Sequence, residues 1–133
     1  MSLTNEDKQL LTQLHLDKCR SCLADGEQLL EIDSVSAAAN RFYYAVFHAI
    51  HALFIANGIY SKSHHGMNAK FHLHFIKSGI LDPKYGHFIA VMENMREKAD
   101  YDVLYDVTRE DLEALKPIAY ELVEQVQNLL ATK

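Results

Sequence analysis

The stretch from Phe42 to Ser61 contains no Asp, Glu, Lys or Arg, and this run constrains the fold of the 133-residue chain more than any other feature. It approaches the length of a membrane-spanning helix, but His48, His51 and Asn57 lie inside it, together with a glycine. We therefore predict a buried helix with neighbours on two sides rather than a membrane span. With 49% hydrophobic and 23% charged residues, the chain has the composition of a soluble globular protein and not of a disordered one.

Apolar residues at helical spacing predict five helices. They are expected at residues 4–32, 34–57, 66–78, 82–103 and from 108 almost to the end of the chain. Thr4 with Asp7 resembles a capping box, Asp82 and Pro83 are typical of an N-cap and a first helical position, and Pro117 is an expected kink. Short connections predict an all-α, up-and-down bundle of four to five helices, in one domain spanning residues 1–133. The apolar second helix further predicts a homodimer, in which a shared face completes its burial.

The formal charge of −5, from 13 basic and 18 acidic residues, argues against binding of nucleic acid over the whole surface. Residues 60–88 are the exception, with a net charge of +3 and five histidines. The N-terminus has no secretory signal, and two cysteines do not form a disulfide framework. We therefore expect a cytoplasmic protein without a membrane segment.

Two groups of residues have the side chains of a metal site but are better explained without one. Cys19 and Cys22 form a C-x-x-C with His15 one turn earlier, yet they lie in the middle of a predicted helix and are typical of half-buried cysteines. A second group contains only imidazoles, with no carboxylate or thiol nearby and no pair at i, i+4; its members are His64, His65, His72 and His74. No metal and no cofactor are expected.

Two arginines are candidates for binding an anion. Arg96 and Asp100 lie four residues apart on a mostly apolar helix face, which indicates either a positioned guanidinium or a structural ion pair. Arg41 is the only charge between Asp33 and Lys62, and it shares its face with Tyr44 and His48. It must therefore either bond helix carbonyls and a carboxylate such as Asp100, or be presented to a nucleotide or RNA phosphate.

Four segments in order resemble the HEPN family, the higher eukaryotes and prokaryotes nucleotide-binding domain, in its small stand-alone prokaryotic branch. They are SAAANRFYYAVFHAIHALFIANG (36–58), KSHHG (62–66), FHLHFIKSG (71–79) and REKADYD (96–102). The resemblance implies a four- or five-helix bundle that is usually a homodimer. It also implies a minimal nucleotidyltransferase as partner, in a toxin–antitoxin pair or a two-part nucleotidyltransferase.

Active members of this superfamily are metal-independent RNA endonucleases in which a His follows an Arg after four to six residues. The Arg corresponds to Arg96, but no His follows it, and Tyr101 occupies the nearest place. An unperturbed phenol is a poor general base at pH 7, so the motif is degenerate and we expect weak or absent cleavage. Arg41 and His48 have six residues between them and are a substitute pair in an earlier helix.

The resemblance assigns the site as follows. The catalytic candidates are Arg96, Asp100 and Tyr101, and the nucleotide- or RNA-binding candidates are Arg41, Tyr44, His48, Lys62, His64 and His65. The favoured hypothesis is a HEPN protein that acts with a nucleotidyltransferase and handles RNA or nucleotide in a groove lined by these arginines. The alternatives are a non-catalytic dimeric adaptor and a nucleotide-binding sensor.

Overall fold

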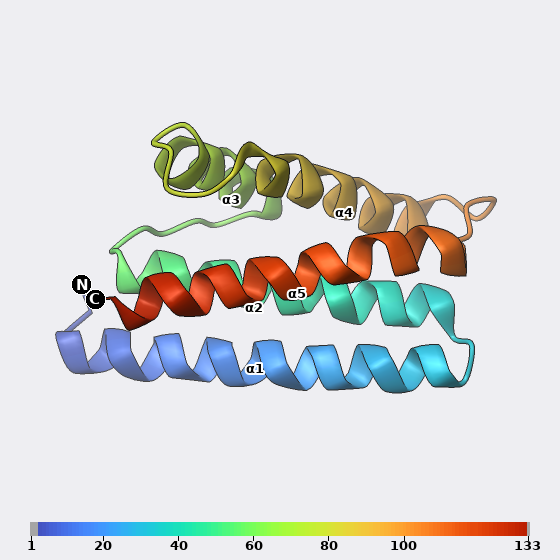
Figure 1. Cartoon of the computed structure of the whole chain (residues 1–133), viewed down its shortest axis with the longest axis horizontal. Coiled ribbons are helices and arrows are strands. Elements are labelled where there is room, and N and C mark those ends of the chain that lie inside the picture. Colours follow the sequence, from blue (N-terminus) through green and yellow to red (C-terminus); the bar gives the residue numbers. More distant parts are fainter. Residues whose placement is uncertain (1–2, 133) are drawn as a thin grey trace.

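Helix α2 (Val35–Ala56) lies at the centre of the computed structural model, which describes residues 3–132. It contacts α1 (Asn5–Glu31), α4 (Pro83–Tyr101) and α5 (Arg109–Ala131). Figure 1 shows these four long helices running alternately in opposite directions, with both ends of the chain at the same end of the bundle. The short α3 (His64–Phe71) and a π-helical turn (His72–Ile76) connect α2 to α4. The predicted all-α, up-and-down bundle is confirmed, and residues 3–132 contain no strand.

The central position of α2 follows from its side chains, because more than half of its 22 residues are buried. Its closest neighbour is α1, where Gly26 lies against the fully buried ring of Phe42. A Cβ atom at Gly26 would lie 2.9 Å from two carbons of that ring, so only glycine lets the two helices approach this closely. The polar face of α2, which carries Arg41, Tyr44 and His48, is half-buried rather than enclosed.

Most of the predicted helix ends are confirmed, because they depend on local hydrogen bonds. Thr4 and Asp7 form the capping box of α1, and the side chain of Thr108 accepts a hydrogen bond from a backbone N–H in the first turn of α5. Gly58 and Gly79 have φ angles of 71° and 83°, the left-handed conformation expected of residues that follow a helix.

The predicted third helix is wrong in its start and in its regularity. It begins at His64 rather than Gly66, because the hydroxyl of Ser63 caps it by accepting from the N–H of Gly66. Its second half widens into the π-helical turn, closed by a hydrogen bond from the N–H of Lys77 to the carbonyl of His72. Phe71 and Phe75, four residues apart, are both buried in the core. Helix α4 ends two residues earlier than expected, and α5 continues through Pro117.

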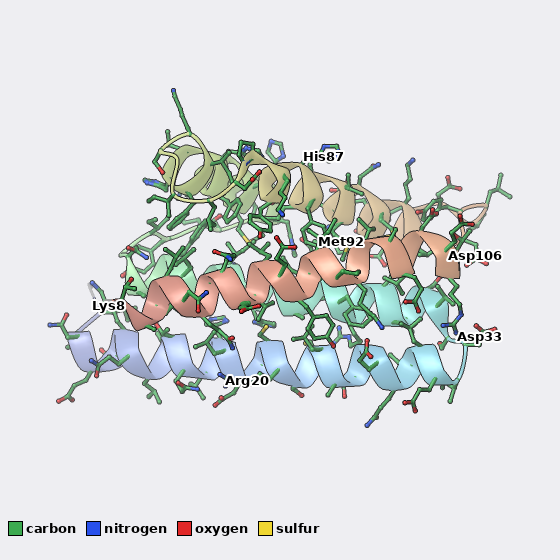
Figure 2. All side chains as sticks on the ribbon, in the orientation of Figure 1. Lys8, Arg20, Asp33, His87, Met92 and Asp106 are labelled. Atoms are coloured by element: carbon green, nitrogen blue, oxygen red, sulfur yellow. The ribbon has the colours of Figure 1, made fainter. Side chains whose placement is uncertain are left out.

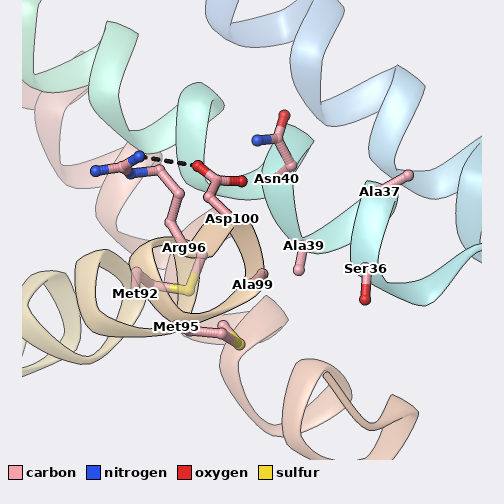
Figure 3. Close-up of a pocket in the computed structure, with 9 residues that line it drawn as sticks. All are labelled: Ser36, Ala37, Ala39, Asn40, Met92, Met95, Arg96, Ala99 and Asp100. Atoms are coloured by element: carbon pink, nitrogen blue, oxygen red, sulfur yellow. Dashed lines mark hydrogen bonds and ion pairs between the residues drawn. The ribbon is translucent and has the colours of Figure 1, made fainter. Parts of the chain in front are cut away.

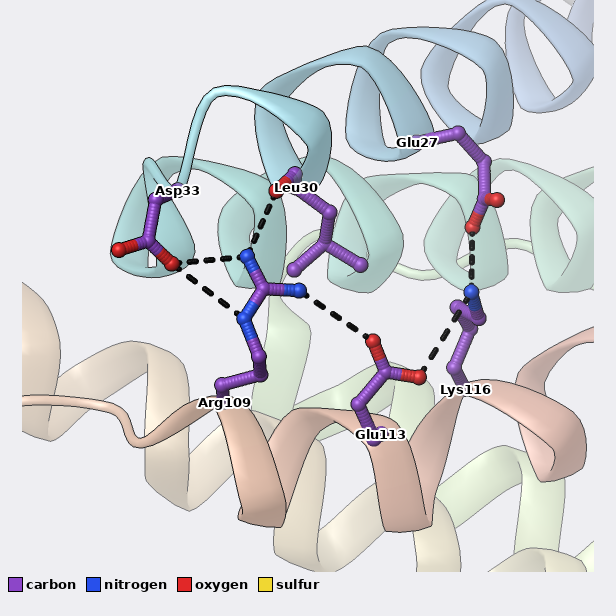
Figure 4. Close-up of polar contacts among 6 residues, drawn as sticks. All are labelled: Glu27, Leu30, Asp33, Arg109, Glu113 and Lys116. Atoms are coloured by element: carbon purple, nitrogen blue, oxygen red, sulfur yellow. Dashed lines mark hydrogen bonds and ion pairs between the residues drawn. The ribbon is translucent and has the colours of Figure 1, made fainter.

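One end of the bundle is held by ionic contacts between α5 and the turn that joins α1 to α2 (Figure 4). Arg109 Nη2 lies 2.8 Å from Asp33 Oδ1 and 2.7 Å from the carbonyl oxygen of Leu30. Glu113 connects Arg109 to Lys116, which pairs with Glu27 at 3.0 Å. These contacts cross from the last helix to the first.

Within residues 3–132, no helix combines the length and apolar character needed to cross a bilayer.

Candidate functional site

A pocket of about 240 Å³ lies between α2 and α4 (Figure 3). Helix α2 supplies the polar side chains of Ser36 and Asn40, and α4 supplies Arg96 and Asp100. The rest of the lining is apolar and consists of Ala37, Ala39, Met92, Met95 and Ala99. One guanidinium and a few polar atoms on an apolar wall are typical of a small anion or ligand site.

Arg96 is the central group of this pocket. Its side chain is only 12% exposed, and Nη1 lies 3.1 Å from Oδ2 of Asp100. The guanidinium carbon stands 5.3 Å from the centroid of the Tyr43 ring, in a cation–π contact. Its Nε–H is buried and has no hydrogen-bond partner among the described residues. A buried donor without a partner costs free energy, so this atom is suited to a ligand oxygen.

Tyr43 connects Arg96 to His64 at the start of α3. The phenol is 3% exposed, and burial raises the pKa of Tyr43 to about 12, so its hydroxyl is protonated at neutral pH. The hydroxyl oxygen lies 2.5 Å from Nδ1 of His64. Burial, followed by the charge of Arg96, lowers the pKa of His64, so the imidazole is neutral at pH 7. Tyr43 therefore donates and Nδ1 accepts, which places the proton of His64 on Nε2.

Arg41 lies beside this pocket rather than in it. Its Nε and Nη2 donate to Oδ1 of Asn40 at 3.2 and 2.7 Å, and its guanidinium carbon stands 5.3 Å from the Tyr44 ring centroid. Among the described residues no carboxylate pairs with Arg41, because Asp100 pairs with Arg96 instead. Asn40 therefore contacts Arg41 and lines the Arg96 pocket, which joins the two arginines into one polar strip.

His48 belongs to a different cluster, formed with His15 of α1 and His51. The Nδ1 atoms of His15 and His48 lie 3.0 Å apart, so one donates and the other accepts. The rings of His15 and His51 stack with centroids 5.4 Å apart. Burial, followed by the charge of the neighbouring imidazoles, lowers the pKa of His48 and of His51 to about 4. These histidines are neutral at pH 7, and His48 has one ring nitrogen engaged by His15.

The structure thus brings some of the predicted site residues together and separates others. Arg96 and Asp100 share the pocket, and Tyr43 links them to His64. Tyr101 is 82% exposed at the end of α4, and Lys62 and His65 are exposed. Sequence reasoning missed the roles of Asn40 and Tyr43. Both residues flank Arg41 in the run NRFYY (40–44). This run belongs to a segment that resembles the HEPN family, so it could have pointed to them.

The cysteines form no metal or redox site with the described residues, although Nη1 of Arg41 donates to Sγ of Cys22 at 3.9 Å. Cys19 and Cys22 are 1% and 2% exposed, and burial raises the pKa of Cys19 to about 12, so its thiol is protonated and unreactive. His15, which precedes them by one turn, contacts His48 instead. In residues 3–132, no three His, Cys, Asp or Glu side chains are grouped so that they could hold a metal ion.

Comparisons with known proteins identify the family of the chain. The family model described as the HEPN domain matches residues 12–129. A UPF0332 protein of Thermotoga maritima is 28% identical over 124 residues, which cover 93% of this chain and 94% of that protein. A protein of Methanocaldococcus jannaschii named "Putative toxin" is 30% identical over 129 residues, covering 97% and 96%. A second protein of the same organism, with the same kind of name, is 28% identical over 118 residues, covering 89% and 80%.

Proposed function

The chain belongs to the HEPN family, and on that premise we propose that it binds the phosphate of an RNA or a nucleotide through Arg96. We propose further that it acts with a minimal nucleotidyltransferase in a toxin–antitoxin pair. The observation that carries the first part is the guanidinium of Arg96, nearly buried in a pocket and with its Nε–H unpartnered among the described residues. The names of two relatives, "Putative toxin", support the toxin role in the second part.

A phosphate suits this guanidinium better than a neutral ligand does. Phosphate oxygens accept two parallel hydrogen bonds from an arginine, and the contact with the Tyr43 ring helps to position the guanidinium. Asp100 is 43% exposed, so it can turn toward solvent when an anion takes its place. The amide of Asn40 adds a neutral donor for another phosphate oxygen, whereas the hydroxyl of Ser36 donates to Asp106.

The same geometry supports binding more than cleavage. A metal-independent ribonuclease needs a general base within hydrogen-bond reach of the ribose 2′-hydroxyl. Nδ1 of His64 is occupied by Tyr43, one ring nitrogen of His48 is engaged by His15, and Tyr101 lies in solvent. We therefore assign the isolated chain weak or absent RNA cleavage, and a role as binding component of the pair.

The proposed homodimer draws support from the half-buried face of α2. Tyr44, Phe47, His48 and His51 are all half-buried on this helix, next to His64. Their rings contact one another, with the Phe47 centroid 4.3 Å from that of His51 and 4.6 Å from that of His64. A second copy would complete the burial of this aromatic face.

The experiment is a titration with AMP and with a short single-stranded RNA, followed by nuclear magnetic resonance of the arginine Nε–H groups. We expect the Nε–H signal of Arg96 to shift on binding. Arg96→Ala should lose at least about tenfold in affinity, and Arg96→Lys should retain part of it. Arg20→Ala is the matched control, because Arg20 is an exposed arginine on α1 paired with Asp17.

An unchanged affinity in Arg96→Ala would refute the phosphate site. If no RNA or nucleotide binds but a co-expressed nucleotidyltransferase copurifies, the adaptor function is favoured. Growth arrest on expression of the chain alone, relieved by the nucleotidyltransferase, would support the toxin role.

A further inference from the structure

The loop between α4 and α5 exposes two aliphatic side chains almost completely. Val103 is 99% exposed and Leu104 is 92% exposed, and Tyr101, just before them, is 82% exposed. Scattered apolar residues are ordinary on a protein surface, but three within four positions form a contiguous apolar tip. We call Tyr101, Val103 and Leu104 the apolar tip.

The tip is held in an ordered turn. The N–H of Tyr105 donates to the carbonyl of Asp102 at 3.1 Å, and the N–H of Leu104 donates to the Asp102 carboxylate at 3.0 Å. After the turn, Tyr105 packs against the core and Val107 is 4% exposed. The apolar residues that follow the tip are therefore packed into the protein, whereas those of the tip itself point into solvent. Such a preorganised tip loses little conformational entropy when it binds a partner.

The surroundings of the tip are strongly acidic. Residues 97–111 contain six acidic and two basic side chains, and Arg109 is already paired with Asp33. Asp106 accepts a hydrogen bond from Ser36 at 3.1 Å, which ties the loop to the start of α2. Figure 2 shows Asp33 and Asp106 at the same end of the bundle. The apolar tip thus lies in a segment rich in carboxylates.

We infer that the apolar tip is a docking site for a partner protein that offers an apolar surface bordered by Lys or Arg. The inference deepens the proposed function and rests on its assignment of a protein partner. Charge complementarity selects this occupant. A nucleic acid is disfavoured at the tip itself, where, among the described residues, Asp102 and Asp106 stand without a cation such as the Arg96 guanidinium that the phosphate proposal uses. A second copy of the chain would bring the same acidic surface against itself across a two-fold axis.

The test uses an amphipathic helical peptide of leucine and lysine as the probe, with full-length protein and residue-resolved nuclear magnetic resonance. We expect the peptide to shift signals of residues 101–106, and Val103→Ser with Leu104→Ser to weaken binding at least about tenfold. Leu10→Ser with Leu14→Ser is the matched control, because these leucines are 60% and 52% exposed on α1, and it should bind as the wild type does.

Two further experiments test whether charge complementarity contributes to binding. A peptide with glutamate in place of lysine should not bind, and Asp102→Asn with Asp106→Asn should weaken the lysine peptide while keeping the acceptor oxygens of the turn. Equal losses in the tip and control variants, or shifts confined to other helices, would overturn the inference. So would a wild-type dimer that becomes monomeric in the tip variant. AMP binding at Arg96, measured on the same samples, reports separately on the phosphate proposal.

Discussion

The guanidinium of Arg96 stands over the ring of Tyr43, with its carbon 5.3 Å from the ring centroid. The hydroxyl of the same tyrosine contacts His64, and the charge of Arg96 on α4 acts directly on this imidazole of α3. Burial, followed by this charge, lowers the pKa of His64 and keeps its imidazole neutral at pH 7, while Arg96 carries the positive charge of the pocket.

Removing the charge of Arg96 should raise the pKa of His64. Burial keeps that pKa below its usual value, and the positive guanidinium lowers it further. Arg96→Met removes the charge and keeps an apolar stem, so burial, which lowers the pKa, and the carboxylates of Glu93 and Glu97, which raise it, are the effects that are left. The measurement is a titration of His64 by nuclear magnetic resonance, with Arg20→Met as the remote control. An identical midpoint in wild type and Arg96→Met would show that the two groups do not interact.

How far the sequence predicts this site depends on which interactions are local. The capping residues and the pair Arg96 and Asp100 are separated by three or four positions, so helical geometry alone brings them together. The contact of Tyr43 with His64 joins two helices, and its register depends on packing that periodicity does not specify. Periodicity also could not decide whether Asp100 of α4 pairs with Arg41 of α2, because this contact too would join two helices. In the structure Arg41 instead donates to the adjacent Asn40.

Gly26→Ala should destabilise the fold by about 1 kcal/mol. The added methyl group would press on the buried ring of Phe42, and overpacking a core costs about 1–3 kcal/mol, of which the better helix propensity of alanine returns up to about 1 kcal/mol. Gly86→Ala is the contrasting case, because its neighbour is the exposed ring of His72, which can rotate away. Urea unfolding should show a lower midpoint for Gly26→Ala only, and equal midpoints would contradict the close helix approach.

Arg109→Ala should cost about 1 kcal/mol, mainly through the carbonyl of Leu30 at the end of α1, which loses its side-chain donor. The ion pair itself contributes less, since Asp33 is 81% exposed. Asp33 has a φ of 63°, a conformation that Asn also tolerates, so Asp33→Asn should stay within about 0.5 kcal/mol of the wild type. A larger loss in Asp33→Asn than in Arg109→Ala, measured by thermal unfolding, would mean that the charge pair dominates this turn.

The histidine cluster should make the fold less stable as the pH falls from about 6.5 to about 4. Burial, followed by the charge of the neighbouring imidazoles, lowers the pKa of His48 and His51 to about 4 in the folded state, from a usual value of 6.5. Between these two values the unfolded chain binds more protons than the folded one, so the free energy of unfolding rises with pH. Because both rings are only half-buried, we expect about 2–4 kcal/mol for the two together.

Carboxylates also titrate in this range, so the prediction needs a comparison between variants. His48→Asn removes one imidazole from the cluster and retains a polar side chain next to His15. Its free energy of unfolding should depend less steeply on pH between about 4 and 6.5 than that of the wild type. His65→Asn, which changes an exposed histidine outside the cluster, should keep the wild-type slope. If the free energy of unfolding depends equally on pH in all three proteins, His48 has the same pKa in the folded and the unfolded chain. Its burial between α1 and α2 would then not keep it neutral.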